Sequence, residues 1–87
     1  MDVKKVIEMC EEMFDDCSAR TVKDLGRHYG VAMGPKESRY VGGMVLFVDK
    51  KTGEIDAGRR NEIPKGSTSY IRGETVWENT QETEDGN

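Results

Sequence analysis

The 87-residue chain has little cysteine, histidine, proline and large aliphatic side chains. Two cysteines are too few for a disulfide scaffold, and a single histidine leaves no zinc-ligand pattern. The longest apolar run, Met44 to Val48, is too short to span a bilayer. The N-terminus lacks the unbroken apolar stretch of a signal peptide. Phosphate-loop and calcium-loop spacings are also absent. We therefore expect a cytoplasmic protein with no cofactor and no membrane partner.

Charged residues are abundant, at 34% of the chain, and the net charge is −4. Residues 1–77 carry thirteen acidic and thirteen basic side chains, so the four acids of residues 78–87 account for the whole net charge. Binding to nucleic acid without sequence preference needs an excess of Lys and Arg, so a protein partner ranks above nucleic acid. We expect one domain over residues 1–77 and an acidic, disordered tail over residues 78–87.

Apolar residues at three- and four-residue steps over residues 3–17 predict a first helix. Its apolar face comprises Val3, Val6, Ile7, Cys10, Met13, Phe14 and Cys17. Seven helical residues would separate the two cysteines by about 10.5 Å. A disulfide needs its Cα atoms within about 7 Å, so the thiols are expected to pack in the core without bonding. Thr21, with Asp24 three residues later, predicts a second, shorter helix that ends at Gly30.

The pattern changes to strand after residue 40. Val41–Val48 is an almost continuous run of strand-forming residues. Gly53 is placed to adopt a left-handed conformation in a hairpin turn, and Glu54–Arg59 follows as the return strand. Ser69–Trp77 is expected to form a third strand. The predicted fold is α+β, with two N-terminal helices followed by a three-stranded antiparallel β-meander (ααβββ).

Two helices can cover only one face of such a sheet. Val45, Phe47 and Tyr70 are therefore expected to leave an apolar patch on the other face. This patch suggests contact with another chain, either an identical subunit in a homodimer through the sheet or a target protein. The alternative is that the loop 31–39 or the tail folds back over it.

Acidic residues mark the first predicted helix as a candidate binding surface. Like charges four residues apart, and acids at the negative end of the helix dipole, oppose helix stability. One explanation is placement for a partner with a basic surface, and the other is an ordinary solvated face near Arg20, Lys23 or Arg27. By analogy of size and charge with phage and mobile-element inhibitors of host nucleic-acid enzymes, we expect a non-enzymatic inhibitor or adaptor. The candidate partner-binding residues are Glu8, Glu11, Glu12, Asp15 and Asp16.

A nucleic-acid-binding regulator is the alternative. Residues 21–31 resemble the first helix and turn of a helix-turn-helix, and the predicted hairpin could serve as a wing. However, Met33-Gly34-Pro35 is a poor start for a recognition helix. A catalytic interpretation depends on Cys17 and His28 alone. We therefore expect no enzymatic activity and assign no catalytic or metal-binding residue. The candidate nucleic-acid-binding residues are Lys36, Arg39, Lys50, Lys51, Arg59 and Arg60.

Overall fold

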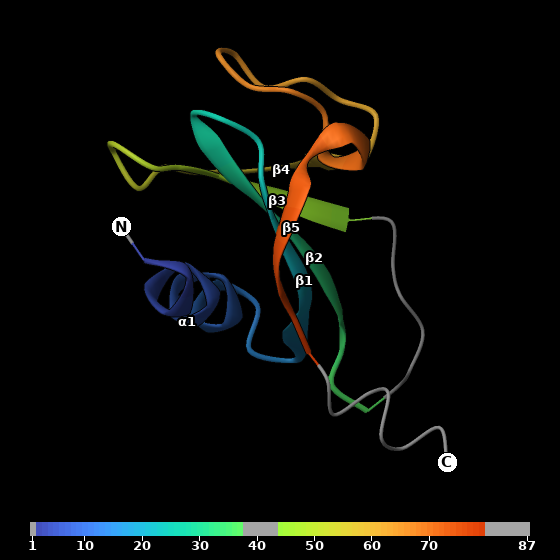
Figure 1. The fold of residues 1–87 in the computed structure, drawn as a ribbon. Helices are drawn as coiled ribbons and strands as arrows, with labels where there is room; N and C mark the ends of the chain where they lie inside the picture. The colour runs from blue at the N-terminus through green and yellow to red at the C-terminus, as the bar shows by residue number, and fades with distance from the viewer. Residues whose placement is uncertain (1, 38–43, 80–87) are drawn as a thin grey trace.

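The computed structural model describes residues 2–37 and 44–79. Over these ranges the chain forms one α-helix, α1 (Val3–Met13), one 3-10 turn, η1 (Tyr70–Arg72), and five strands. The strands are β1 (Cys17–Asp24), β2 (His28–Pro35), β3 (Met44–Asp49), β4 (Ile55–Arg59) and β5 (Glu74–Glu78). They form one antiparallel sheet in the order β4-β3-β2-β1-β5 (Figure 1). The prediction of two helices and a three-stranded meander is therefore wrong, although the domain is still α+β.

The residues expected in the second helix form the β1–β2 hairpin instead. Thr21 was expected to cap a helix with Asp24 completing the capping box, but Thr21 lies within β1 and Asp24 Oδ1 accepts a hydrogen bond of 2.9 Å from the backbone N–H of Gly26. Gly26 takes a φ of +107°, a conformation that favours glycine, and so turns the chain back. An Asp two residues before such a glycine is as typical of a tight turn as of a helix start. This region therefore contains no helix-turn-helix.

Gly30 was expected to stop a helix, but it lies inside β2 for a packing reason. A Cβ at this position would lie 2.9 Å from a carbon of Leu25 and 2.9 Å from a carbon of Tyr70. Real Cβ atoms do not approach other atoms so closely, so the missing side chain is what lets both residues pack against the sheet. A glycine in a strand often marks such a close approach.

The first helix forms as predicted but ends four residues early. The Asp2 side chain caps its start by accepting a backbone N–H three residues further on. The Phe14 N–H donates to the Cys10 carbonyl at the other end. A turn at residues 15–16 then leads into β1, so Cys17 belongs to a strand and not to the helix.

The second half of the chain follows the sequence pattern more closely. Gly53 has a φ of +80° in the predicted β3–β4 turn, and β4 lies within the predicted return strand. The start of the preceding strand, at residues 41–43, lies outside the described residues. The third predicted strand, Ser69–Trp77, is in fact η1 followed by β5. Of the expected tail, Glu78 ends β5, and residues 80–87 lie outside the described residues.

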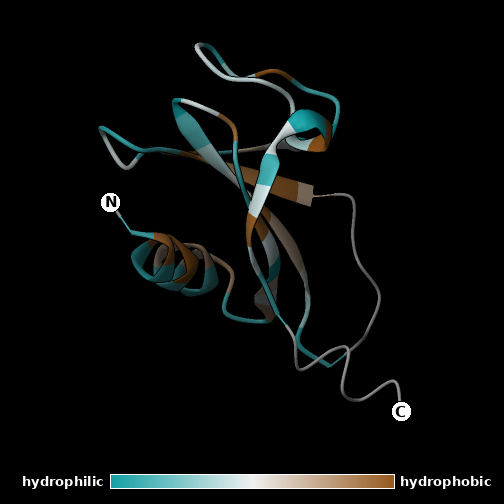
Figure 2. Ribbon diagram, viewed as in Figure 1, coloured by the Kyte–Doolittle hydropathy of each residue, from teal (hydrophilic) through white to brown (hydrophobic). Residues whose placement is uncertain are grey.

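The sheet carries a hydrophobic cluster on each face. On one face α1 turns its hydrophobic side toward the sheet (Figure 2). The second face is covered by residues 60–73, here called the crossover segment, which joins β4 to β5 and includes η1. The first cluster contains Val6, Cys10, Ala19, Val22, Val31, Met33, Leu46 and Val48. The second contains Leu25, Ala32, Val45, Phe47 and Tyr70.

The expectation of an open apolar face is consequently wrong. Val45, Phe47 and Tyr70 are only 0, 4 and 3% exposed. Since β4 and β5 are the two edge strands, the segment between them has to cross a face of the sheet, and α1 already occupies the other one. The crossover segment supplies Tyr70 to the cluster it covers. The argument for a homodimer through this face therefore no longer holds.

Candidate functional site

The predicted partner-binding residues divide between α1 and the turn that follows it. Glu8 and Glu12 are exposed on α1, and Asp15 and Asp16 are exposed in the turn before β1. The structure therefore keeps these four carboxylates close together along the chain and open to solvent. We call them the acidic surface.

Glu11 has a different position from the other four. It is partly buried, and its Oε2 accepts a hydrogen bond of 2.9 Å from the backbone N–H of Ala19. This bond ties α1 to β1 at the point where the pairing of β1 with β2 shifts register. Glu11 thus contributes to holding the helix on the sheet, and we leave it out of the acidic surface.

The four carboxylates of the acidic surface form no direct ion pair with basic residues within the described ranges, although Lys36 is close to Asp16, whose carbonyl accepts its backbone N–H at 3.0 Å. Ion pairs occur elsewhere, between Arg27 Nε and Asp49 Oδ2 at 3.1 Å and between Lys50 Nζ and Asp24 Oδ1 at 2.7 Å. Lys23, which was considered as a neutralising residue, instead lies over the ring of Tyr70. Residues 2–37 and 44–79 hold no ion pair with any of the four carboxylates.

The charges of α1 also do not serve the helix itself. Its first turn contains no acidic residue and its last turn no basic one. Asp15 and Asp16 instead follow the C-terminal end, where the helix dipole is negative. An acidic residue at this end of the helix, or two acidic residues four positions apart, lowers helix stability by a few tenths of a kcal/mol or more. The intramolecular contacts therefore give no stabilising reason for this cluster of carboxylates.

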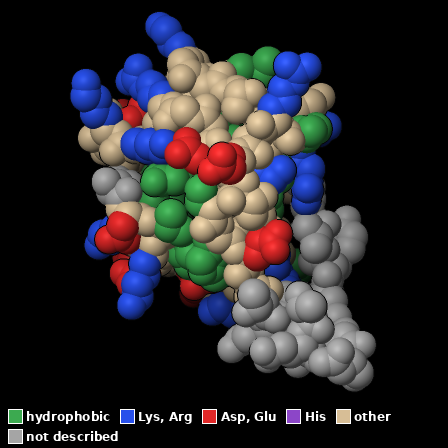
Figure 3. Space-filling model, viewed as in Figure 1, with side chains coloured by type: hydrophobic (Ala, Val, Ile, Leu, Met, Phe, Trp, Pro, Cys, Tyr) green, Lys and Arg blue, Asp and Glu red, His purple; other side chains and the backbone are tan. Residues whose placement is uncertain are grey.

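Partly buried hydrophobic residues adjoin α1. Ile7, Phe14 and Trp77 pack against the first hydrophobic cluster without being fully buried. Figure 3 shows hydrophobic side chains gathered in the middle of this face, between α1 and β5, with charged side chains around them. A partner that meets the acidic surface would find apolar area beside it.

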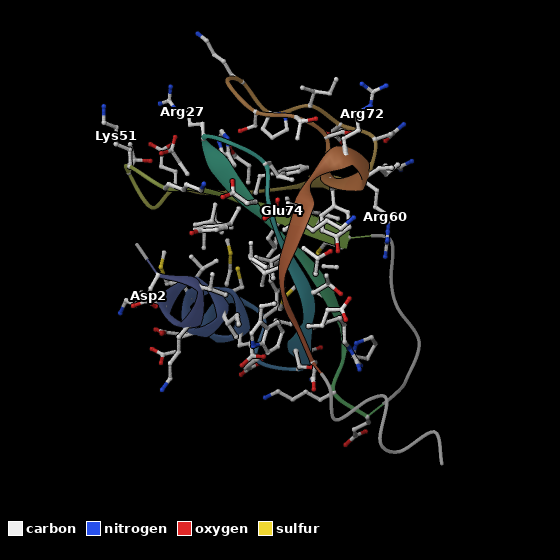
Figure 4. The ribbon with its side chains drawn as sticks, in the orientation of Figure 1. Asp2, Arg27, Lys51, Arg60, Arg72 and Glu74 are labelled. Carbon is white, nitrogen blue, oxygen red and sulfur yellow. The ribbon has the colours of Figure 1, made fainter. Side chains whose placement is uncertain are left out.

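The alternative nucleic-acid-binding residues are not brought together into one patch. Lys50 is held by Asp24 and also lies over the ring of Tyr29, 4.6 Å from its centroid. Lys51 is at the β3–β4 turn, whereas Arg59 pairs with Met44 at the far end of the same hairpin. Figure 4 shows Lys51 and Arg60 on opposite sides of the molecule. Lys36 is exposed after β2, and Arg39 lies outside the described residues.

The two residues considered for catalysis are also far apart. Cys17 is opposite Pro35 at one end of the β1–β2 hairpin, and His28 begins β2 at the other end. Seven residues of strand separate His28 from Pro35, about 23 Å at about 3.3 Å per residue. Burial raises the pKa of the Cys10 thiol to about 12, and burial followed by the charge of Asp16 raises that of Cys17. The thiolate is the nucleophilic form of cysteine, and a raised pKa disfavours it, so neither thiol is activated for nucleophilic attack.

One polar cluster was missed by the sequence analysis. Ser67, from the crossover segment, places its Oγ 2.8 Å from His28 Nδ1 and accepts the His28 backbone N–H at 3.0 Å. The Nε2 atom of His28 lies 3.9 Å from Asp49 Oδ2. Asp49 Oδ1 accepts the backbone N–H groups of Lys51 and Thr52 at 2.7 and 3.0 Å. No sequence signal joins these residues, because 39 positions separate His28 from Ser67.

This cluster is best explained as a connection between the crossover segment and the sheet. The Nε2–Asp49 distance is too long for a hydrogen bond, and Asp49 is already engaged by Arg27 and two backbone N–H groups. The two turn N–H groups, followed by Arg27, hold the pKa of Asp49 at about 2. A hollow of about 380 Å³ lies beside His28 and Asp49, but Ser67 does not line it. Ser67 instead lines a separate hollow of about 530 Å³, together with Ile63 and Ile71. Asp49 does not orient the His28 ring by a hydrogen bond, as the base of a nucleophilic serine requires, so the cluster is assigned a structural role.

The described part of the chain holds no group of three or more His, Cys, Asp or Glu side chains arranged to bind a metal ion. Within the same residues, no helix has the length and apolar character needed to cross a membrane. The chain matches no protein-family model, no curated protein and no solved structure.

Proposed function

We propose that this protein is a small, non-enzymatic binding protein that acts as an inhibitor or adaptor by presenting its acidic surface to a basic partner. The observation that carries the proposal is that the four exposed carboxylates have no ion pair within the described residues. Exposed carboxylates that form no ion pair within these residues are available for contact with another molecule. Opposite charges across such an interface accelerate encounter and select the partner.

The surroundings of the acidic surface favour a protein partner. Burial of the apolar side chains beside α1 stabilises a contact that opposite charges alone would hold only weakly. Exposed ion pairs are worth only about 0–1 kcal/mol each, so specificity needs this additional apolar area. The free thiols of Cys10 and Cys17 suit a reducing compartment, and we propose the cytoplasm as the place of action.

The proposal is tested by capturing partners with the full chain as bait and identifying them by mass spectrometry. In the test variant Glu8, Glu12, Asp15 and Asp16 are changed to Lys, and Glu11 is kept because it holds Ala19. The control variant makes the same change of net charge at four exposed acids elsewhere. These are Glu37, Glu54, Asp56 and Glu74.

We expect the wild-type chain and the control variant to capture the same basic protein, and the test variant to lose it. Capture should also weaken as salt is raised, because exposed charges are screened over a Debye length of about 10 Å at 0.1 M. Circular dichroism checks that all three chains are folded. If the folded test variant captures the same proteins as the wild type, the acidic surface is only a solvated face and the proposal is refuted.

A further inference from the structure

The crossover segment carries an exposed apolar surface of its own. Ile63 and Ile71 are 71 and 62% exposed, which is unusual for large aliphatic side chains. A hollow of about 530 Å³ lies between them and is also lined by Arg72. Large aliphatic side chains around a hollow are typical of a surface that binds another molecule.

The same segment is basic. It contains Arg60, Lys65 and Arg72 and a single acid, Glu62. The Oε1 atom of Glu62 accepts the backbone N–H of Arg59. Within residues 2–37 and 44–79, none of these three cations belongs to an ion pair. Figure 4 shows Arg60 and Arg72 on the same side of the molecule, near η1.

This surface is complementary to the acidic surface of the same chain. The crossover segment has Lys65 and Arg72, which form no ion pair within the described residues, beside exposed Ile63 and Ile71, whereas Arg60 lies over the ring of Tyr70. The acidic surface has carboxylates without an ion pair in the same residues and Met13, which is 55% exposed. α1 packs on one face of the sheet and the crossover segment on the other, so the two surfaces cannot meet within one molecule. They can meet between two copies.

We propose that the crossover segment is a docking surface for the acidic surface of a second copy of this chain. The inference rests on the proposed function, because it uses the same acidic surface and names a partner for it. The two contacting surfaces differ, so the contact is head-to-tail. A pair of copies therefore keeps one free acidic surface and one free crossover surface, and association continues into a ring or an open chain that grows with concentration.

The test is the mass of the full chain in solution, measured by light scattering from about 1 µM to about 1 mM, where weak contacts dissociate. We expect the weight-average mass to rise from 9.8 kDa by roughly twofold or more at low salt, and to fall back at about 0.5 M salt. A chain that stays monomeric over this whole range at low salt overturns the inference.

Charge reversal identifies the two surfaces. We expect the crossover variant Lys65→Glu/Arg72→Glu to stay monomeric, while the control Lys51→Glu, a charge reversal at the β3–β4 turn outside both surfaces, associates like the wild type. The acidic-surface variant described above should also stay monomeric. Mixing it with the crossover variant should restore association, because every contact between the two variants joins opposite charges. Association that survives either reversal, or a mixture that stays monomeric, contradicts the head-to-tail contact.

The crossover variant also separates this inference from the proposed function. Its acidic surface is unchanged, so it should still capture a basic partner protein while failing to associate with itself. A wild-type chain that is monomeric but captures a partner through its acidic surface refutes the self-association alone. If reversal of the acidic surface changes neither capture nor mass, both proposals are refuted.

Discussion

Replacement of Tyr70 by Ala should show how far the crossover segment stabilises the fold. Tyr70 is 3% exposed, packs with Leu25, Val45 and Phe47, and is the crossover segment's contribution to the second hydrophobic cluster. Truncating a buried aromatic residue typically costs about 3–5 kcal/mol. A domain of this size has about 5–15 kcal/mol in total, so the change should remove a large part of the free energy of unfolding.

The measurement is urea or thermal unfolding followed by the fluorescence of Trp77, which lies on the other face of the sheet. A loss of about 3 kcal/mol corresponds to a decrease in Tm of about 12 °C or more. The control Tyr70→Phe keeps the ring and removes the hydroxyl that bonds Thr21, so it should cost only about 0.5–1.5 kcal/mol. If Tyr70→Ala unfolds within about 1 kcal/mol of the wild type, the crossover segment is not needed to cover the second face, and the reasoning fails.

Three further predictions concern single positions. Gly30→Ala should destabilise the fold by about 1–3 kcal/mol, because its Cβ would overpack the side chains above β2, and chemical denaturation measures this directly. The lowered pKa of Asp49 means that its stabilising contribution is complete above the ordinary value of 3.8 and disappears as the pH falls through about 2. Asp49→Asn should therefore flatten the acid end of the pH–stability curve, and an unchanged curve would contradict the role of the turn N–H groups. Glu11→Gln should lower the free energy of unfolding by about 1 kcal/mol, because it weakens the hydrogen bond to Ala19. The control Glu12→Gln should change it by less than about 0.5 kcal/mol. Equal effects of the two substitutions would show that Glu11 is not a structural residue.

Local patterns predict the elements whose stability comes from their own residues. The periodicity of Val6 and Cys10 correctly places α1, because a continuous apolar stripe on eleven residues has few other solutions. Gly53 correctly marks the β3–β4 turn, because its left-handed φ is a local requirement. The β1–β2 hairpin was missed because Asp24 and Gly30 fit a helix boundary as well as a turn and a tightly packed strand.

Part of the candidate site could also be predicted from local sequence patterns, and part could not. The sequence predicts an acidic cluster, but only the structure separates Glu11, which bonds Ala19, from the carboxylates that remain available to a partner. The contact between His28 and Ser67, and the position of the crossover segment over the second face of the sheet, depend on which strands form the edges of the sheet. No local pattern reports that order.

By itself, the sequence determined a small α+β domain, its acidic first helix and its β3–β4 hairpin, because each depends on side-chain spacing over fewer than about twenty residues. The tertiary structure alone decided that β5 pairs with β1, that the crossover segment closes the second face, and that the acidic and basic surfaces lie on opposite sides of the sheet. These features depend on pairings between distant residues, and their free energy comes from burying Tyr70 against strands that lie far away in the chain.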